Sequence, residues 1–236
     1  MTPATVTSSA PWRARYLAGA LFLFLTSFSF AGPQPGAVVA GPAQVVDGDT
    51  IEIAGQRIRL EGIDAPEQAQ TCTTAMGEPW PCGKAATRAL LDVIGREPIA
   101  CESVGTDKYG RMLGLCFLDG EDINRYMVEA GFAWAFVKYS AKYVNEEAVA
   151  RAAKSGIWQG GAEPAWDFRH KGWQVAESTA PKGCAIKGNV SRSGRIYHLP
   201  WSPWYGKVTV DEARGERWFC SEAEAQAAGW RAAAAN

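Results

Sequence analysis

The sequence predicts an α+β fold in which a small antiparallel β-barrel carries helices and a smaller disulfide-linked domain follows. Three observations lead to this prediction. Short runs rich in β-branched residues, separated by Asp-Gly and Ala-Gly turns, dominate the first half of the chain. Segments with apolar residues at helical spacing lie between and after these runs. Six cysteines in 236 residues are enough for three disulfides.

The N-terminus predicts an export signal. Arg13 and Arg15 precede the apolar run YLAGALFLFLTSFSFAG, in which Ser29 and Ala31 have the spacing of a cleavage site. We therefore expect residues 1–31 to be a signal peptide and the mature protein to be secreted or periplasmic. An uncleaved anchor is the alternative, and membrane contact is expected only in that case, although the run is short for a bilayer span.

The barrel and its helices are expected from alternating strand-like and helix-like segments. The predicted strands are Gly41–Val46, Thr50–Ala54 and Arg57–Ile63, followed by a hairpin of Ile99–Val104 and Met112–Leu118. The predicted helices are Gly83–Ile94, Ile123–Ala130 and Val144–Lys154, the last of which ends before Gly156.

The C-terminal part predicts a second, smaller domain. Residues 161–182 mix Gly, Pro, Trp and charge without a period, which is typical of an irregular tail and linker. Ser221 and Glu224 form a capping box near the end of the chain, before a helix that stops at Gly229. We therefore expect a barrel domain over residues 40–160 and an accessory domain over residues 183–231.

Composition and charge limit the possible functions. The chain is 47% hydrophobic and 21% charged, which excludes a disordered or polytopic membrane protein. Removal of residues 1–31 would delete two arginines and no acids, which leaves 22 basic and 25 acidic residues and a formal charge of −3. A general nucleic-acid binder is usually basic, so any site for a polyanion must be local.

The cysteine spacing favours one set of disulfides among the fifteen possible pairings. Cys101 and Cys116 are symmetric about the Lys108–Tyr109 bond, and they would face each other across a two-residue hairpin. Cys72 and Cys82 bracket a loop rich in Gly and Pro, which leaves Cys184 for Cys220. Zinc is the alternative, but the chain has no close CxxC pair and only two histidines.

Two strand-like stretches also carry carboxylates. VVDGDTIE places Asp47 and Asp49 on either side of a glycine, and RIRLEGIDAPE contains Arg59, Asp64 and Glu67. Taken singly, each feature has a structural explanation: Asp-Gly and Asp64 before Ala-Pro suit turns, and Arg59 suits an edge strand. Their joint occurrence in this order favours a functional site.

With Arg111 in TDKYGR, the set becomes four carboxylates and two arginines at strand ends and turns. DKYG also has a purely structural explanation, because it can form the turn of the hairpin that places Cys101 opposite Cys116. Carboxylates suit a hard cation such as Ca²⁺, whereas the planar guanidinium suits phosphate. A divalent ion beside paired arginines is suited to attack on a phosphodiester, and Glu67 is the carboxylate left to act as a base.

These motifs, together with the later MVEAGFAWAF, resemble the staphylococcal nuclease (thermonuclease) family from about Val45 to Trp158. The resemblance implies an OB-fold, a five-stranded barrel with three helices, and a Ca²⁺-dependent nuclease of DNA or RNA that leaves 3′-phosphate products. CAIKGN, RIYHLP and GERWFCSEAEA resemble small accessory domains of bacterial secreted nucleases. We expect a monomer without a stable protein partner.

The resemblance also implies a calcium site. Asp49 and Asp64 correspond to the calcium-binding carboxylates, and the next ligand is the backbone carbonyl of Ala65, where many relatives carry Thr. Asp47 corresponds to a supporting carboxylate behind them.

Further residues correspond to catalytic and substrate-binding positions. Glu67 matches the proposed general base, and Arg59 and Arg111 match two phosphate-binding arginines. The positions that would contact the nucleotide are Lys108, Tyr109 and Tyr139, with Val137 where another family tyrosine stands.

Two alternatives to a nuclease are a binding module that grips nucleic acid without cutting it and a scaffold whose C-terminal domain is the working part. A degenerate binding module usually lacks some of the carboxylates or arginines, and none is missing here. His170 and His198 both lie outside the motif region, which argues against histidine-based nuclease chemistry.

Overall fold

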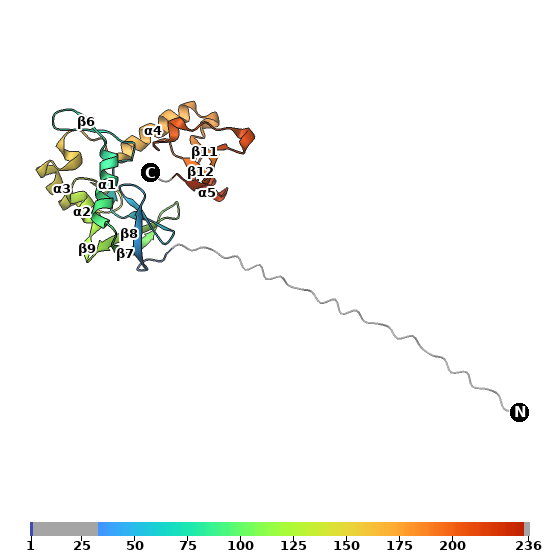
Figure 1. Cartoon of the computed structure of the whole chain (residues 1–236), viewed down its shortest axis with the longest axis horizontal. Coiled ribbons are helices and arrows are strands. Elements are labelled where there is room, and N and C mark those ends of the chain that lie inside the picture. Colours follow the sequence, from blue (N-terminus) through green and yellow to red (C-terminus); the bar gives the residue numbers. More distant parts are fainter. Residues whose placement is uncertain (2–32, 234–236) are drawn as a thin grey trace. The chain divides into compact units, whose positions relative to one another are not determined.

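The computed structural model describes Met1 and residues 33–233 (Figure 1). Every element discussed below belongs to the second of the two units into which the chain divides, Ala31–Asn236. The predicted signal peptide lies outside the described residues, apart from Met1. Within the described residues, no helix is both long and apolar enough to cross a membrane.

The first half of the second unit is a closed five-stranded barrel, drawn in blue to green in Figure 1. Its strand order is β3-β2-β1-β7-β8, and β3 also pairs with β8. The strands are β1 (Val38–Val45), β2 (Thr50–Ile53), β3 (Gln56–Leu60), β7 (Pro98–Thr106) and β8 (Met112–Leu118). The short β9 (Glu121–Asp122) pairs antiparallel with the end of β8.

The prediction of a wholly antiparallel barrel is wrong at the closing pair, because β3 and β8 run parallel. Parallel neighbours need a long crossover, and here the chain passes through α1 and β7 between them. The α+β class and the OB-like barrel with three helices are confirmed.

The helices cover a core built from the inward faces of the strands. They are α1 (Cys82–Ile94), α2 (Ile123–Glu129) and α3 (Val144–Ala153), close to the predicted bounds. Of the apolar residues at helical spacing in α1, Ala86, Leu90 and Ile94 are buried and join a cluster with Ile51 and Ile58 of the barrel. Leu91, expected with them, is 46% exposed.

All three predicted disulfides are present: Cys72–Cys82, Cys101–Cys116 and Cys184–Cys220. The first lies beside the small hairpin of β5 (Cys72–Thr73) and β6 (Pro79–Trp80).

Cys101 and Cys116 are direct cross-strand partners in the hairpin of β7 and β8. The predicted two-residue turn is nevertheless wrong. The register shifts between Ser103 and Gly105, and Thr106 pairs with Met112, so five residues form the loop. The shift is a β-bulge, which inserts one extra residue and thereby moves the turn away from the centre that the cysteines define.

The segment expected to be an irregular tail contains α4 (Ala165–Thr179), so that prediction is wrong over most of its length. Trp166 of α4 stacks on Phe136, with ring centroids 5.7 Å apart and an interplanar angle of 13°. Trp166 also meets Trp134 edge to face at 6.0 Å. These tertiary contacts stabilise a helix that its sequence alone, interrupted by Gly172, specifies weakly.

A four-stranded sheet forms the C-terminal region, drawn in orange and red in Figure 1. Its order is β13 (Arg217–Phe219), β11 (Ile186–Ser191), β12 (Gly194–His198) and β14 (Arg231–Ala232), with α5 (Glu222–Ala227) packed against it. The remaining short elements are β4 (Ile63–Asp64), β10 (Trp134–Ala135), and the 3₁₀ helices Gly156–Gln159, Pro181–Gly183, Tyr205–Lys207 and Glu212–Arg214.

Candidate active site

The turn between β1 and β2 brings Asp47 and Asp49 to one end of the barrel. The Asp49 amide donates to Asp47 Oδ1 at 3.1 Å, which closes a local turn around Gly48. A Cβ on Gly48 would lie 2.7 Å from the Ala65 Cβ and 2.9 Å from the Ala86 Cβ. The glycine is therefore needed because the turn packs directly against Ala65, which follows β4, and against Ala86 of α1. The local turn is confirmed, and the role of the two acids as a site stays a prediction.

Arg59 joins the two carboxylates that the resemblance assigns to calcium. It projects from β3, where its Nη1 contacts Asp49 Oδ1 at 2.7 Å and its Nη2 contacts Asp64 Oδ1 at 2.6 Å. Asp64 is fully buried, and Asp49 Oδ2 accepts a hydrogen bond from the Ala65 amide at 3.2 Å. One guanidinium therefore fixes the spacing of two buried acids, one from the turn between β1 and β2 and one from β4.

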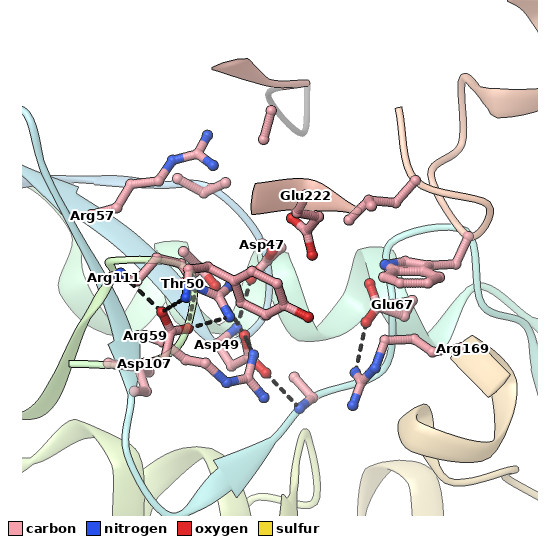
Figure 2. A pocket seen from close by; sticks show the side chains of 18 of the residues that line it. Asp47, Asp49, Thr50, Arg57, Arg59, Glu67, Asp107, Arg111, Arg169 and Glu222 are labelled. Atoms are coloured by element: carbon pink, nitrogen blue, oxygen red, sulfur yellow. Dashed lines mark hydrogen bonds and ion pairs between the residues drawn. The ribbon is translucent and has the colours of Figure 1, made fainter. Parts of the chain in front are cut away.

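A third arginine at this site, Arg169 of α4, was not found by sequence reasoning. Its Nη2 lies 2.8 Å from Asp64 Oδ2 and its Nη1 lies 3.1 Å from Asp64 Oδ1, a bidentate pair. The same Nη1 lies 2.7 Å from Glu67 Oε1, as Figure 2 shows. The sequence signal for Arg169 was the run AWDFRHKGW. If this run is helical, Arg169 lies on the same face as Trp166 and Trp173.

The β7–β8 turn carries Arg111 to the same pocket but ties it to a neighbour. Its Nη2 and Nε both lie 2.7 Å from Asp107 Oδ2, and Figure 2 shows the two side chains together. Asp107 Oδ1 also accepts from the amides of Tyr109 and Arg111, each at 2.9 Å. Asp107, a second residue that sequence reasoning missed, therefore fixes the shape of the turn and the direction of Arg111.

The predicted substrate-contact residues reach the pocket to different degrees. Tyr109 lies beneath both Lys108 and Arg111, with Lys108 Nζ 4.7 Å from its ring centroid and Arg111 Cζ 5.5 Å from it. Tyr139 is 67% exposed and meets Phe136 edge to face. Val137, also exposed, is not among the residues that line the pocket.

Burial and mutual repulsion shift the pKa values of the acids. Burial, reinforced by the Asp49 charge, raises the pKa of Asp47 to about 6. Burial also raises the pKa of Glu67 to about 8, although Arg169 opposes the shift. Burial is the largest influence on Asp49 and disfavours its charged form, but Arg59, the Ala65 amide and Arg169 together outweigh burial and lower the pKa of Asp49. The site therefore holds more negative charge than its arginines neutralise.

The side-chain and backbone oxygens of the site determine which metal ion it could hold. Within the described residues, no group of three or more His, Cys, Asp and Glu side chains is arranged to hold a metal. Asp49 and Asp64 are instead bound by arginines. The oxygen donors and the excess negative charge nevertheless fit a hard divalent cation, which takes carboxylate, carbonyl and water ligands.

Asp47, Asp49, Arg59, Glu67, Arg111 and Arg169 line one pocket of about 1150 Å³, and Asp64 lies buried behind its wall. It combines the buried acids with arginines from the barrel, with residues of α4, and with residues of the C-terminal region that include Glu222 (Figure 2). Buried carboxylates and converging guanidiniums at the open end of an OB-like barrel define a class of hydrolytic enzyme that acts on phosphodiesters.

Comparisons with known proteins identify the family within this class. The family model described as Staphylococcal nuclease homologue matches residues 57–160, and a second model, described as ArfC, matches residues 159–232. The chain is 40% identical over 130 residues to the succinoglycan biosynthesis protein ExoI of Rhizobium meliloti (strain 1021), covering 54% of this chain and 68% of that protein. It is 33% identical over 162 residues to a protein of Escherichia coli O157:H7 named as an uncharacterized endonuclease, covering 64% of this chain and 97% of that protein.

A staphylococcal-like nuclease of Oryza sativa subsp. japonica is also similar, with 34% identity over 116 residues that cover 48% of this chain and 29% of the rice protein. The chain belongs to the staphylococcal nuclease family. It is a nuclease, and its substrate is nucleic acid.

Proposed function

We propose that this chain is an exported, Ca²⁺-dependent nuclease that hydrolyses DNA or RNA and leaves 3′-phosphate products. The observation that carries the proposal is the bridge that Arg59 makes between buried Asp49 and Asp64, with Glu67 and Arg111 lining the same pocket. Three disulfides support export, because such bonds persist in oxidising compartments.

The arginines bind and orient the scissile phosphate. Arg59 and Arg111 present planar forks that suit two phosphate oxygens, and both are half-buried, so their charges are screened less than on an open surface. In the reaction, the oxygen of a water molecule forms a bond to phosphorus while the bond from phosphorus to the 5′-oxygen breaks. The guanidiniums stabilise the charge that grows on the phosphoryl oxygens.

Glu67 takes a proton from the attacking water, and the departing 5′-oxygen takes up a proton. A base works best when its pKa is near the working pH, and burial raises the pKa of Glu67 to about 8. Arg169 lies 2.7 Å from the Glu67 carboxylate and holds it in the pocket.

Calcium would be held by Asp49, Asp64 and the Ala65 carbonyl, with Asp47 behind them. When bound, it supplies charge neutralisation and polarisation at the phosphate. Mg²⁺ should support activity poorly, because it demands tight octahedral geometry and gives up its water reluctantly.

The test is hydrolysis of single-stranded DNA by the purified mature protein with calcium, with and without a chelator. Arg111→Ala should lower turnover by about 10²–10³-fold, and Arg111→Lys should not restore it, because a point charge cannot form the fork. Arg88→Ala is a matched control, since Arg88 is 73% exposed, also pairs with a carboxylate four residues away, and does not line the pocket. Activity that survives both chelation and Arg111→Ala would contradict the proposal.

Asp49→Ala should abolish the calcium-dependent activity. Asp47→Ala should cost less, because Asp47 supports the proposed ligands from behind. Equal losses for the two variants would contradict their assigned roles.

A further inference from the structure

One face of α4 extends the pocket beyond the nuclease barrel. Trp166, Arg169, His170 and Trp173 are spaced i, i+3, i+4 and i+7, which places them on one side of the helix. All four line the same pocket as Arg59 and Glu67. This part of the chain lies outside the match to the nuclease family model, which ends at residue 160.

The tryptophans of this face have different environments. Trp166 is stacked on Phe136 and contacts Trp134, so it serves to dock α4 on the barrel. Trp173 is only half-buried, and its ring meets Trp201 at 6.0 Å with an interplanar angle of 42°. Trp173 Nε1 donates a hydrogen bond to Glu177 Oε1, which fixes the orientation of the ring.

Trp201 lies in the segment that follows β12, and this segment packs closely on α4. A Cβ on Gly172 would lie 3.9 Å from the Trp201 backbone nitrogen. Trp201 is half-buried and lines the pocket, together with uncharged neighbours that include Leu199 and Pro203. The residues of this segment that line the pocket, which lie between Leu199 and Pro203, offer an aromatic ring and no charged side chain, which suits a nucleotide base rather than a phosphate.

The size of the pocket is consistent with a second contact point. Its volume of about 1150 Å³ exceeds the range of roughly 300–1,000 Å³ that is common for small-molecule sites. The arginines and carboxylates account for one part of the lining, and the tryptophan pair lies in another. The pocket therefore has room for more than the nucleotide that is cut.

We propose that Trp173 and Trp201 form a base-stacking subsite for a nucleotide of the same strand, away from the scissile phosphate. The C-terminal region thereby forms a second wall of the substrate site and strengthens binding of single strands long enough to reach it. This inference rests on the proposed function. Stacking on an aromatic side chain tolerates any base, so the subsite should increase affinity without reading sequence.

The experiment measures binding and cleavage with the full mature chain and two substrates, a fluorescein-labelled decathymidylate and a thymidine dinucleotide. Trp173→Ala and Trp201→Ala should each raise the Kd and KM for the decamer by about 5- to 150-fold, the range that corresponds to loss of one stacked base. The KM for the dinucleotide should rise much less, and kcat for the decamer should change little.

Trp204→Ala is the matched control. Trp204 is in the same loop and is 38% exposed, but it contacts Lys207 and does not line the pocket. Trp173 also packs against the core of the C-terminal sheet, so Trp173→Phe is included as a variant that keeps an aromatic ring. It should retain most of the affinity for the decamer.

Three outcomes would overturn the inference: wild-type affinity of the Trp173→Ala/Trp201→Ala double variant, equal losses on the two substrates, or an equal loss for Trp204→Ala. If the wild-type protein cleaves neither substrate with calcium, the proposed function fails. Anisotropy titration of the labelled decamer still tests the subsite in that case, because it requires no cleavage.

Discussion

Replacement of Arg169 by methionine tests whether α4 is part of the active site. Methionine keeps much of the apolar stem and removes the charge, so the variant separates electrostatics from packing. Arg169 forms a fork on Asp64 and a third contact to Glu67. The side chains of Arg169, Asp64 and Glu67 are 22%, 0% and 19% exposed, so the pairs are shielded from water.

The expected loss of stability depends on the charges that remain buried once Arg169 is removed. Breaking a buried ion pair by removing one partner costs about 3–5 kcal/mol, because the other charge stays buried. Asp64 keeps its contact with Arg59 at 2.6 Å, and Glu67, whose pKa burial raises to about 8, can take up a proton instead of staying charged. We therefore expect the lower end, about 3 kcal/mol. For a domain of this size, that corresponds to a fall in Tm of about 6–12 °C.

Urea denaturation and differential scanning calorimetry measure the loss, with Lys171→Met as the control. Lys171 is on the same helix and pairs with Glu163 at 2.6 Å, but its side chain is 70% exposed, so its loss should be undetectable. An Asp64→Asn/Arg169→Met double-mutant cycle then isolates the coupling energy. A loss for Arg169→Met no larger than that for Lys171→Met would refute the reasoning.

Three further predictions concern other parts of the fold. Because the native pKa values of Asp47 and Glu67 are raised to about 6 and about 8, the native state keeps protons that the unfolded chain loses. Urea midpoints should therefore fall as pH rises from about 4 to about 8, and a rise would contradict the assignment. Cys116→Ser should lower stability by about 2–4 kcal/mol, and equal stability of wild type and variant under oxidising conditions would argue against a structural role for its bond to Cys101. Gly48→Ala should cost about 1–3 kcal/mol in urea denaturation through overpacking, whereas unchanged stability would mean that the turn can move.

Sequence patterns were sufficient where the determining contacts are local. Ala86, Leu90 and Ile94 marked the buried face of α1, although Leu91, expected with them, is 46% exposed. The pairing of Cys101 with Cys116 was predicted correctly, although the two-residue turn from which it was derived is absent. The parallel pairing of β3 with β8 could not be predicted in this way, because it is set by how the chain returns through α1 and β7. The bulge at Ser103–Gly105 was also not predicted, although Gly105 is an isolated glycine within the strand and such a glycine often marks a bulge.

The same distinction between local and long-range contacts applies to the residues of the candidate site. Residues from the motifs, such as Asp49, Arg59 and Arg111, are brought to one pocket as their positions suggested. Arg169 meets carboxylates 102 and 105 positions earlier in the chain, so no local pattern could connect them. It also lies in a helix whose stability comes from contacts of Trp166 with the barrel.

The charge balance explains why a helix outside the nuclease barrel reaches into its site. Asp47, Asp49, Asp64 and Glu67 meet in a largely buried space, and Arg111 is held by its own partner, Asp107. Arg59 alone would leave several buried negative charges uncompensated, which is costly. Arg169 supplies the second internal cation, and the same helix face presents Trp173 to the pocket. Stabilisation of the acids therefore follows from docking α4 on the barrel, and the extension of the substrate site that we propose rests on the same helix face, so α4 is packed into the candidate site and is not an irregular linker.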